Sequence, residues 1–333
     1  MGGVAGSKLA VAVTGAGGLG QIGFTGDPHL LDEELTSARR QLRNHKLANE
    51  TGSGHVLPLG TGIIVVGTPV EEFISVISKH NPAVVWLSFG TAAEFQEWTT
   101  KIRQDSPLTK IWVQLGSVGA ALEAARGCRP DALVLQGSDA GGHGHESGAS
   151  IVSLIPEVCD AFRAGGLPDI PLIAAGGIMD GRGVAAALAL GASGVVMGTR
   201  FLGAEEAKAP SQFRQAILEA SDGGQSMARS RAFDAMWGPN PWPETYDGRC
   251  LKNSMYQSIK DGLSTEEARR KLYQDLRGQN VSPQDTMSIW AGTGVGMVKK
   301  VEKAADIVSQ VRKAARETIM LLGMTVERSA DED

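Results

Sequence analysis

The feature that most constrains the fold is the regular return of short, apolar, β-branched runs that end in glycine. Seven such runs occur, at residues 18–24, 56–66, 83–89, 110–115, 132–136, 171–175 and 194–201. Glycine supplies 43 of the 333 residues, about twice its usual share, and a glycine follows each of the seven runs within two residues. Because glycine permits the sharp turn that ends a strand, we expect seven β-strands.

Amphipathic or alanine-rich segments, typical of helices, fill the intervals between the runs. They cover residues 28–46, 69–80, 92–103, 118–126, 151–164 and 182–190. Strict alternation with strands that are apolar throughout indicates a parallel sheet covered by helices. An open doubly wound sheet and a closed barrel both satisfy this pattern. The repeats continue without the break at which a doubly wound sheet reverses its strand order, so we predict an α/β fold of the TIM-type (β/α)8 barrel class.

The barrel is expected to be irregular at its first strand and after its last. An eighth strand should precede Gly6, where only five residues are available, so we predict that the first strand is missing or truncated. Residues 210–297 carry three tryptophans, a proline-rich turn at 238–243 and a charged helix at 265–278, which predicts a helical insertion capping the barrel mouth. Apolar residues then recur every three or four positions from 298 to 322, typical of a one-faced helix. We therefore predict a barrel over 1–209 plus 298–325 and an acidic tail over 326–333.

Charge and cysteine content narrow the function classes. The 32 basic and 37 acidic side chains give a net charge of −5 without a basic cluster, which argues against a nucleic-acid or membrane-surface partner. The sequence has no apolar run of the roughly 18 residues that a membrane-spanning helix needs and no secretion signal after Met1, so we expect a cytoplasmic protein. Cys128, Cys159 and Cys250 lie too far apart for a metal-ligand spacing or a disulfide framework, so we expect no metal.

Two glycine corners follow the last two predicted strands. Gly176 and Gly177 end one strand, and the sequence Met197-Gly198-Thr199 ends the next. In barrels of this type a phosphate commonly binds at the loops after strands seven and eight, where backbone N–H groups can approach it closely. The corners therefore predict a phosphate cradle, although glycines that merely permit tight turns would produce the same pattern.

A histidine on a glycine-rich loop is the candidate for the chemistry. Gln136 ends a strand, and the following loop carries His143 between glycines. Because histidine titrates near neutral pH, His143 can remove a proton from a carbon acid; the alternative is a flexible surface histidine, which we favour for His145. Gln136 is expected to bond the edge of a heterocycle. Residues 290–296 contain a Gly-x-Gly-x-Gly pattern, but no strand precedes it, so we predict a loop over the barrel mouth rather than a nucleotide-binding turn.

These motifs together resemble the nitronate monooxygenase family, once called 2-nitropropane dioxygenases. The matching stretches are Ala-Gly-Gly-Leu-Gly at 16–20, Gln-Gly at 136–137, Asp-Ala-Gly-Gly-His at 139–143, Ala-Gly-Gly-Ile at 175–178 and Met-Gly-Thr at 197–199. The resemblance implies an FMN-dependent barrel in which His143 faces the substrate as a base. It further implies that the cofactor lies against Met1, Gly2, Gln136, Gly141, Gly142, Gly176, Gly177, Met197, Gly198 and Thr199.

The implied reaction is the oxidation of alkyl nitronates by O₂, which yields a carbonyl compound and nitrite. If a neutral nitroalkane is also used, His143 would first take its α-proton. Two alternatives on the same kind of flavin barrel are an NAD(P)H-dependent quinone reductase and an enoyl-thioester reductase. A third, of another class, is a flavin-free binding module without catalytic activity.

Overall fold

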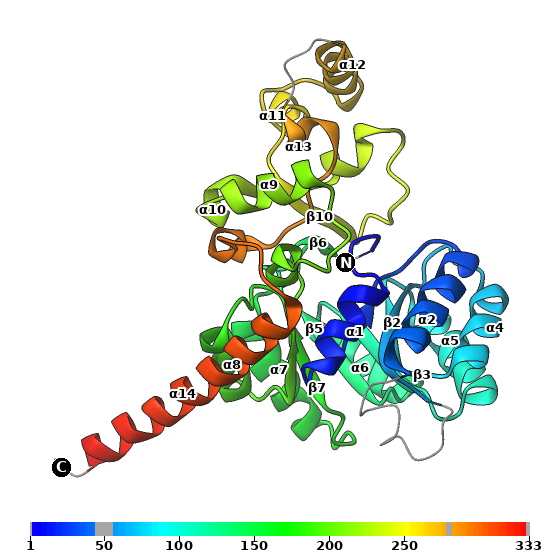
Figure 1. Cartoon of the computed structure of the whole chain (residues 1–333), viewed down its shortest axis with the longest axis vertical. Helices are drawn as coiled ribbons and strands as arrows, with labels where there is room; N and C mark the ends of the chain where they lie inside the picture. Colours follow the sequence, from blue (N-terminus) through cyan, green and yellow to red (C-terminus); the bar gives the residue numbers. More distant parts are fainter. Residues whose placement is uncertain (1, 44–55, 278–281, 331–333) are drawn as a thin grey trace.

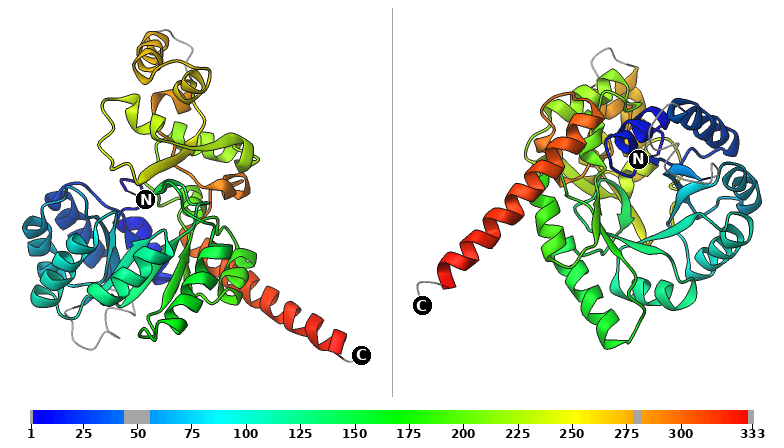
Figure 2. Two further views of the ribbon diagram at one scale, coloured as in Figure 1. Left: turned by 180° about the vertical axis from the view of Figure 1, so that it is seen from behind. Right: turned by 60° about the horizontal axis from the view of Figure 1, so that its bottom comes forward.

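The computed structural model describes residues 2–43, 56–277 and 282–330, and its centre is a curled parallel sheet (Figure 1; Figure 2, right). Seven strands pair in the order β1-β2-β3-β4-β5-β7-β8, each parallel to its neighbour. They are β1 (Gln21–Ile22), β2 (Leu57–Ile64), β3 (Pro82–Ser88), β4 (Lys110–Leu115), β5 (Ala132–Gln136), β7 (Leu172–Ala175) and β8 (Gly194–Val196). The seven predicted strands and their α/β alternation are thus confirmed.

Helices pack around this sheet. They are α1 (Ser7–Gly15), α2 (Pro28–Leu42), α4 (Val70–His80), α5 (Ala92–Asp105), α6 (Val118–Gly127), α7 (Ile151–Ala164), α8 (Gly181–Ala189) and α14 (Ala304–Ala330). Side chains cap several first turns, because the exposed N–H groups there need acceptors. Asp27 accepts from the N–H of His29, and Thr91 forms a capping box with Glu94.

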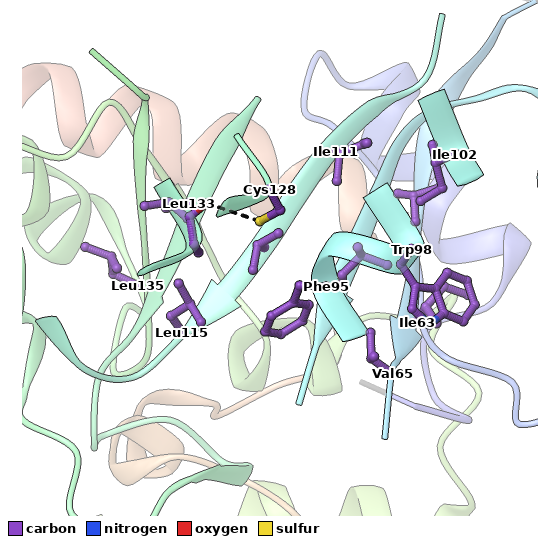
Figure 3. Packing of buried hydrophobic residues seen from close by; sticks show 14 of the residues in the cluster. Ile63, Val65, Phe95, Trp98, Ile102, Ile111, Leu115, Cys128, Leu133 and Leu135 are labelled. Atoms are coloured by element: carbon purple, nitrogen blue, oxygen red, sulfur yellow. Dashed lines mark hydrogen bonds between the residues drawn. The ribbon is translucent and has the colours of Figure 1, made fainter. Parts of the chain in front are cut away.

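Apolar side chains fill the layer between the sheet and the helices. In Figure 3, Phe95, Trp98 and Ile102 of α5 lie beside Ile63 of β2 and Ile111 of β4, and all five are buried. The three α5 residues recur at spacings of three and four, which places them on one face of the helix. Alternate strand residues point the other way, into the curl of the sheet.

The sheet is open between β8 and β1, which makes it a half-barrel. No strand lies between these two edges in the part of the chain that the structure describes, in agreement with the prediction that the first strand is missing or truncated. Helix α14 packs on α8 and on α1 beside this opening. A side chain at Gly181 would lie 2.2 Å from the backbone of Ala315, so this glycine permits the close contact of α8 with α14.

Helix α14 is longer than the periodicity indicates. It begins at Ala304 and continues through Ala330, and its far half projects from the body (Figures 1 and 2). The stretch predicted as a tail, 326–333, therefore begins as helix, and residues 331–333 lie outside the described part.

The segment 210–297, called the cap below, lies above the carboxyl ends of the strands (Figure 1). Its helices are α9 (Ser211–Glu219), α10 (Gly223–Ser226), α11 (Ser254–Lys260), α12 (Thr265–Leu276) and α13 (Pro283–Thr286), with 3₁₀ turns η2 (Arg231–Met236) and η3 (Thr293–Met297); η1 (Thr199–Gly203) precedes it. The cap also holds two strands, β9 (Met227–Ser230) and β10 (Tyr246–Leu251). The expected insertion is therefore not purely helical.

The cap strands pair with the segment that carries the candidate histidine. Strands β9 and β10 form an antiparallel sheet with β6 (Gly142–His145) in the order β6-β10-β9. Gly248 lies opposite His143 in this ladder. The prediction of a glycine-rich loop around His143 is thus wrong in part. Residues 142–145 form a strand because β10 supplies their hydrogen-bond partners.

Among the described residues, no helix combines the length and the apolar character that crossing a lipid bilayer requires.

A buried ion pair joins η1, which follows β8, to the residues just before α14. The Arg200 guanidinium lies 2.6 Å from the Glu302 carboxylate, and both side chains are largely buried. Burial alone would raise the pKa of the Glu302 carboxyl, but hydrogen bonds from Arg200, Gln310 and Lys300 outweigh it and lower this pKa from 4.5 to about 2. The ionised carboxylate is therefore strongly favoured in the folded protein.

This pair predicts an acid-dependent part of the stability. Because the pKa of Glu302 is lowered on folding, its contribution is complete above about pH 4.5 and is lost as the pH falls toward 2. We expect Glu302→Gln to lower the free energy of unfolding by roughly 3 kcal/mol at pH 7, since it leaves Arg200 buried without its charge partner. In urea titrations, the difference in the free energy of unfolding between Glu302→Gln and the unmodified protein should become smaller as the pH falls from 5 to 2. A difference independent of pH would contradict this assignment.

Candidate active site

A cavity of about 760 Å³ lies at the carboxyl ends of the strands, between the half-barrel and the cap. The candidate residues predicted from the sequence line it together, with the exception of Met1, which lies outside the described residues. They are Gly2, Gln136, Gly141, Gly142, His143, Gly176, Gly177, Met197, Gly198 and Thr199. The structure thus brings two distant sets of motifs to one place; the individual roles assigned to them stay predictions.

The corner after β7 needs glycine at both positions. Gly176 has φ of +107° and Gly177 has φ of +73°, in the left-handed region that side chains disfavour. An added Cβ at Gly176 would lie 2.8 Å from the carbonyl oxygen of Gly137, and one at Gly177 would lie 2.9 Å from Cβ of Asp139. The corner therefore packs directly against the loop that follows β5.

Backbone donors at the two corners are available to an anion. In the described part of the chain, the N–H groups of Gly177, Gly198 and Thr199 donate to no backbone carbonyl. The Thr199 hydroxyl oxygen accepts a hydrogen bond from the N–H of Gly292 at 2.9 Å, so its own hydrogen is free to donate elsewhere. A phosphate group in the cavity would find several neutral donors here.

The stretch after Trp290 holds the cap onto the barrel side of the cavity. Thr293 donates to the Asp139 carbonyl from its N–H and to the Asp139 carboxylate from its hydroxyl, both at 3.0 Å. An added Cβ at Gly141 would lie only 2.1 Å from the carbonyl carbon of Ala291. The predicted loop over the mouth is present, partly as η3, and Trp290 lies in the cavity wall.

His143 lies at the junction of the barrel and the cap. Its Nε2 is 2.7 Å from Oδ1 of Asp234, and the two side chains are 14% and 6% exposed. The Trp242 ring stacks on the imidazole with centroids 3.9 Å apart, and the Trp290 ring lies 4.8 Å away. His143 is therefore held at one ring edge and against one ring face, which excludes the alternative of a flexible surface histidine. His145 pairs with Tyr246 and does not line the cavity.

Hydrogen bonds with two other strands orient the Gln136 amide. Its oxygen accepts from the amide nitrogen of Gln114 on β4 at 2.9 Å, and its nitrogen donates to the carbonyl of His143 on β6 at 3.1 Å. One N–H and one oxygen lone pair remain, which suits a contact with the edge of a bound heterocycle.

Sequence reasoning missed Asp234 and did not place Trp242. The tryptophan belongs to the recognised turn cluster, but nothing in that cluster indicates a histidine partner. Asp234 lies 91 residues after His143, in a short 3₁₀ turn with no motif around it. No local signal could have identified it, because the pairing depends on how the cap sits on the barrel. Among the described residues, no group of three or more side chains has the arrangement of a metal site.

Comparisons with known proteins agree with this geometry. A family model described as nitronate monooxygenase matches residues 1–313. The nitronate monooxygenase npaC of Metarhizium robertsii is 39% identical over 317 residues, which cover 93% of this chain and 88% of that protein. The nitronate monooxygenase of Neurospora crassa is 36% identical over 335 residues, covering 95% and 87%. Among solved structures, FabK from Thermotoga maritima has a TM-score of 0.75 at 26% identity, covering 98% and 93%.

The contact between the glycine loop and the cap predicts that Gly141 tolerates no side chain. We expect Gly141→Ala to lower the free energy of unfolding by about 3 kcal/mol, because its Cβ overlaps the backbone of Ala291. Gly119→Ala is the matched control, because an added Cβ there meets nothing within 4 Å. Since alanine favours a helix more than glycine does, this change in α6 should raise the free energy of unfolding by about 0.5–1 kcal/mol. Urea unfolding monitored by circular dichroism measures both. Equal stabilities for the two variants would contradict the close approach.

Proposed function

Because the chain belongs to the nitronate monooxygenase family, we propose that it oxidises alkyl nitronates with O₂ to a carbonyl compound and nitrite, with FMN as its cofactor. The observation that carries the proposal is that both glycine corners and His143 line a single cavity. Its volume of about 760 Å³ lies within the range of small-molecule and cofactor sites.

The residues present fit FMN. The free N–H groups at Gly177, Gly198 and Thr199 would hold the phosphate, in corners that a Cβ would fill. Gly2, Gln136, Gly141, Gly142 and Met197 would contact the rest of the cofactor. Of the described residues in the cavity wall, only Arg312 carries a full charge, and the wall is mainly apolar otherwise. When bound, FMN would supply the redox and oxygen chemistry that amino-acid side chains lack.

The chain's own residues prepare the substrate. For a neutral nitroalkane, His143 would accept the α-proton, and the electron pair of that C–H bond would remain on the carbanion as the nitronate. Trp242 and Trp290 would pack on the alkyl part and exclude water from the reacting carbon. The cap is thus proposed to form the substrate side of the site, while the barrel forms the cofactor side.

The base role of His143 predicts a difference between two substrates. We expect His143→Asn to lower kcat/KM for a nitroalkane by about 10² to 10⁴. The loss for the preformed nitronate should be much smaller, since that substrate needs no proton removed. Nitrite release from matched nitroalkane and nitronate solutions measures both. An equal loss on the two substrates would remove the base assignment.

Reconstitution with FMN tests the cofactor and separates the alternative functions. We expect the chain to bind FMN, and anaerobic nitronate to bleach the bound flavin while NADH does not. Rapid bleaching by NADH would instead favour a quinone or enoyl-thioester reductase. A protein that remains colourless after incubation with FMN would support a non-catalytic binding module. Visible absorption spectra distinguish the three outcomes.

A further inference from the structure

We propose that Asp234 is a positioning residue that fixes the ring orientation and the proton arrangement of His143. The proposal rests on the proposed function, because it concerns how His143 takes a proton from a nitroalkane. Its basis is the 2.7 Å contact between Asp234 Oδ1 and His143 Nε2 in a setting where the carboxylate is 6% exposed.

The surroundings of the carboxylate decide which nitrogen of His143 carries the proton. Asp234 Oδ2 is buried and has no hydrogen-bond partner among the described residues, so the imidazole is the donor on which the buried carboxylate depends. A buried carboxylate without a donor is costly, which favours a hydrogen on Nε2. In neutral imidazole the other nitrogen, Nδ1, is then the acceptor. Because His143 lines the cavity, the proposal assigns the base role to its Nδ1.

The cap segment that carries Asp234 also fixes the face of the ring. The Arg231 guanidinium donates to the carbonyls of Trp242, Pro243 and Tyr246 at 2.8 to 2.9 Å. These bonds tie η2 to the turn that places Trp242 on the imidazole. Asp234 holds one edge of the His143 ring and Trp242 holds one face. Together they oppose the ring rotation that would exchange the two ring nitrogens.

The carboxylate also matches the charge that develops during proton removal. When the α-proton of the nitroalkane moves to Nδ1, its bonding pair stays on the nitronate and the imidazole becomes a cation. That cation forms beside a buried carboxylate, where opposite charges interact strongly because little water screens them. No oxidant or reductant is needed for this step. Proton removal should therefore depend on Asp234, whereas oxidation of a preformed nitronate should depend on it much less.

Asp234→Asn tests this dependence, because the amide keeps the shape of the carboxylate and removes its charge. We expect the ratio of kcat/KM for nitroalkane to kcat/KM for nitronate to fall by about 10 to 100-fold, the rate equivalent of losing a hydrogen bond to a charged group, with a larger deuterium isotope effect for the α-deuterated nitroalkane. Asp247→Asn is the matched control: this cap carboxylate has 8% exposure and pairs with Arg229 rather than with His143. The control should leave the ratio unchanged even if it lowers stability. An unchanged ratio in Asp234→Asn would overturn the proposal.

A spectroscopic measurement keeps the proposal testable if Asp234→Asn fails to fold or if neither substrate is oxidised. In ¹⁵N-histidine-labelled protein, assigned by comparison with His143→Asn, the ring of His143 should show hydrogen on Nε2 and none on Nδ1. Hydrogen on Nδ1 would overturn the role of Asp234 whatever the reaction. Absence of activity on both nitroalkane and nitronate, with hydrogen on Nε2, would instead count against the proposed function alone.

Discussion

The site depends on three backbone segments that approach one another more closely than any side chain would allow. The loop after β5, the corner after β7 and the return of the cap meet at Gly141, Gly176 and Gly292. A Cβ at Gly292 would lie 2.5 Å from the Asp139 carbonyl oxygen, and the corresponding clashes at the other two glycines involve backbone as well. Backbone cannot move aside as a flexible side chain can, so these glycines set the geometry of the whole cavity.

This contact joins the barrel side of the cavity to the cap side, which are the proposed cofactor and substrate sides. The hydrogen bonds of Thr293 with Asp139 and of Gly292 with Thr199 tie the cap to the two segments that would hold FMN. The antiparallel pairing of β6 with β10 ties it to His143 as well. The barrel supplies neutral donors for an anion, while the cap supplies aromatic surface and the carboxylate of Asp234. An imidazole between these two parts can serve as a base only if both hold their positions.

The half-barrel retains this arrangement although its sheet is open between β8 and β1. Helix α14 packs on the helices that flank the opening, and the buried pair of Arg200 with Glu302 anchors the start of that helix beside β8. Because Thr199 lies next to Arg200, this anchor acts directly behind one of the glycine corners.

The sequence by itself determined the seven strands, their helices, the two glycine corners and the candidate histidine. These features arise from local chemistry: β-branched runs favour strands, and glycine permits turns that other residues disfavour. The sequence alone did not predict that β6 is a strand, since four residues rich in glycine have little strand preference until β10 pairs with them. Nor could it connect His143 with Asp234 and Trp242, which lie about 90 to 100 residues further along the chain. Only the tertiary structure decided those contacts, because a hydrogen bond between distant segments depends on how two folded parts pack and leaves no local pattern in either of them.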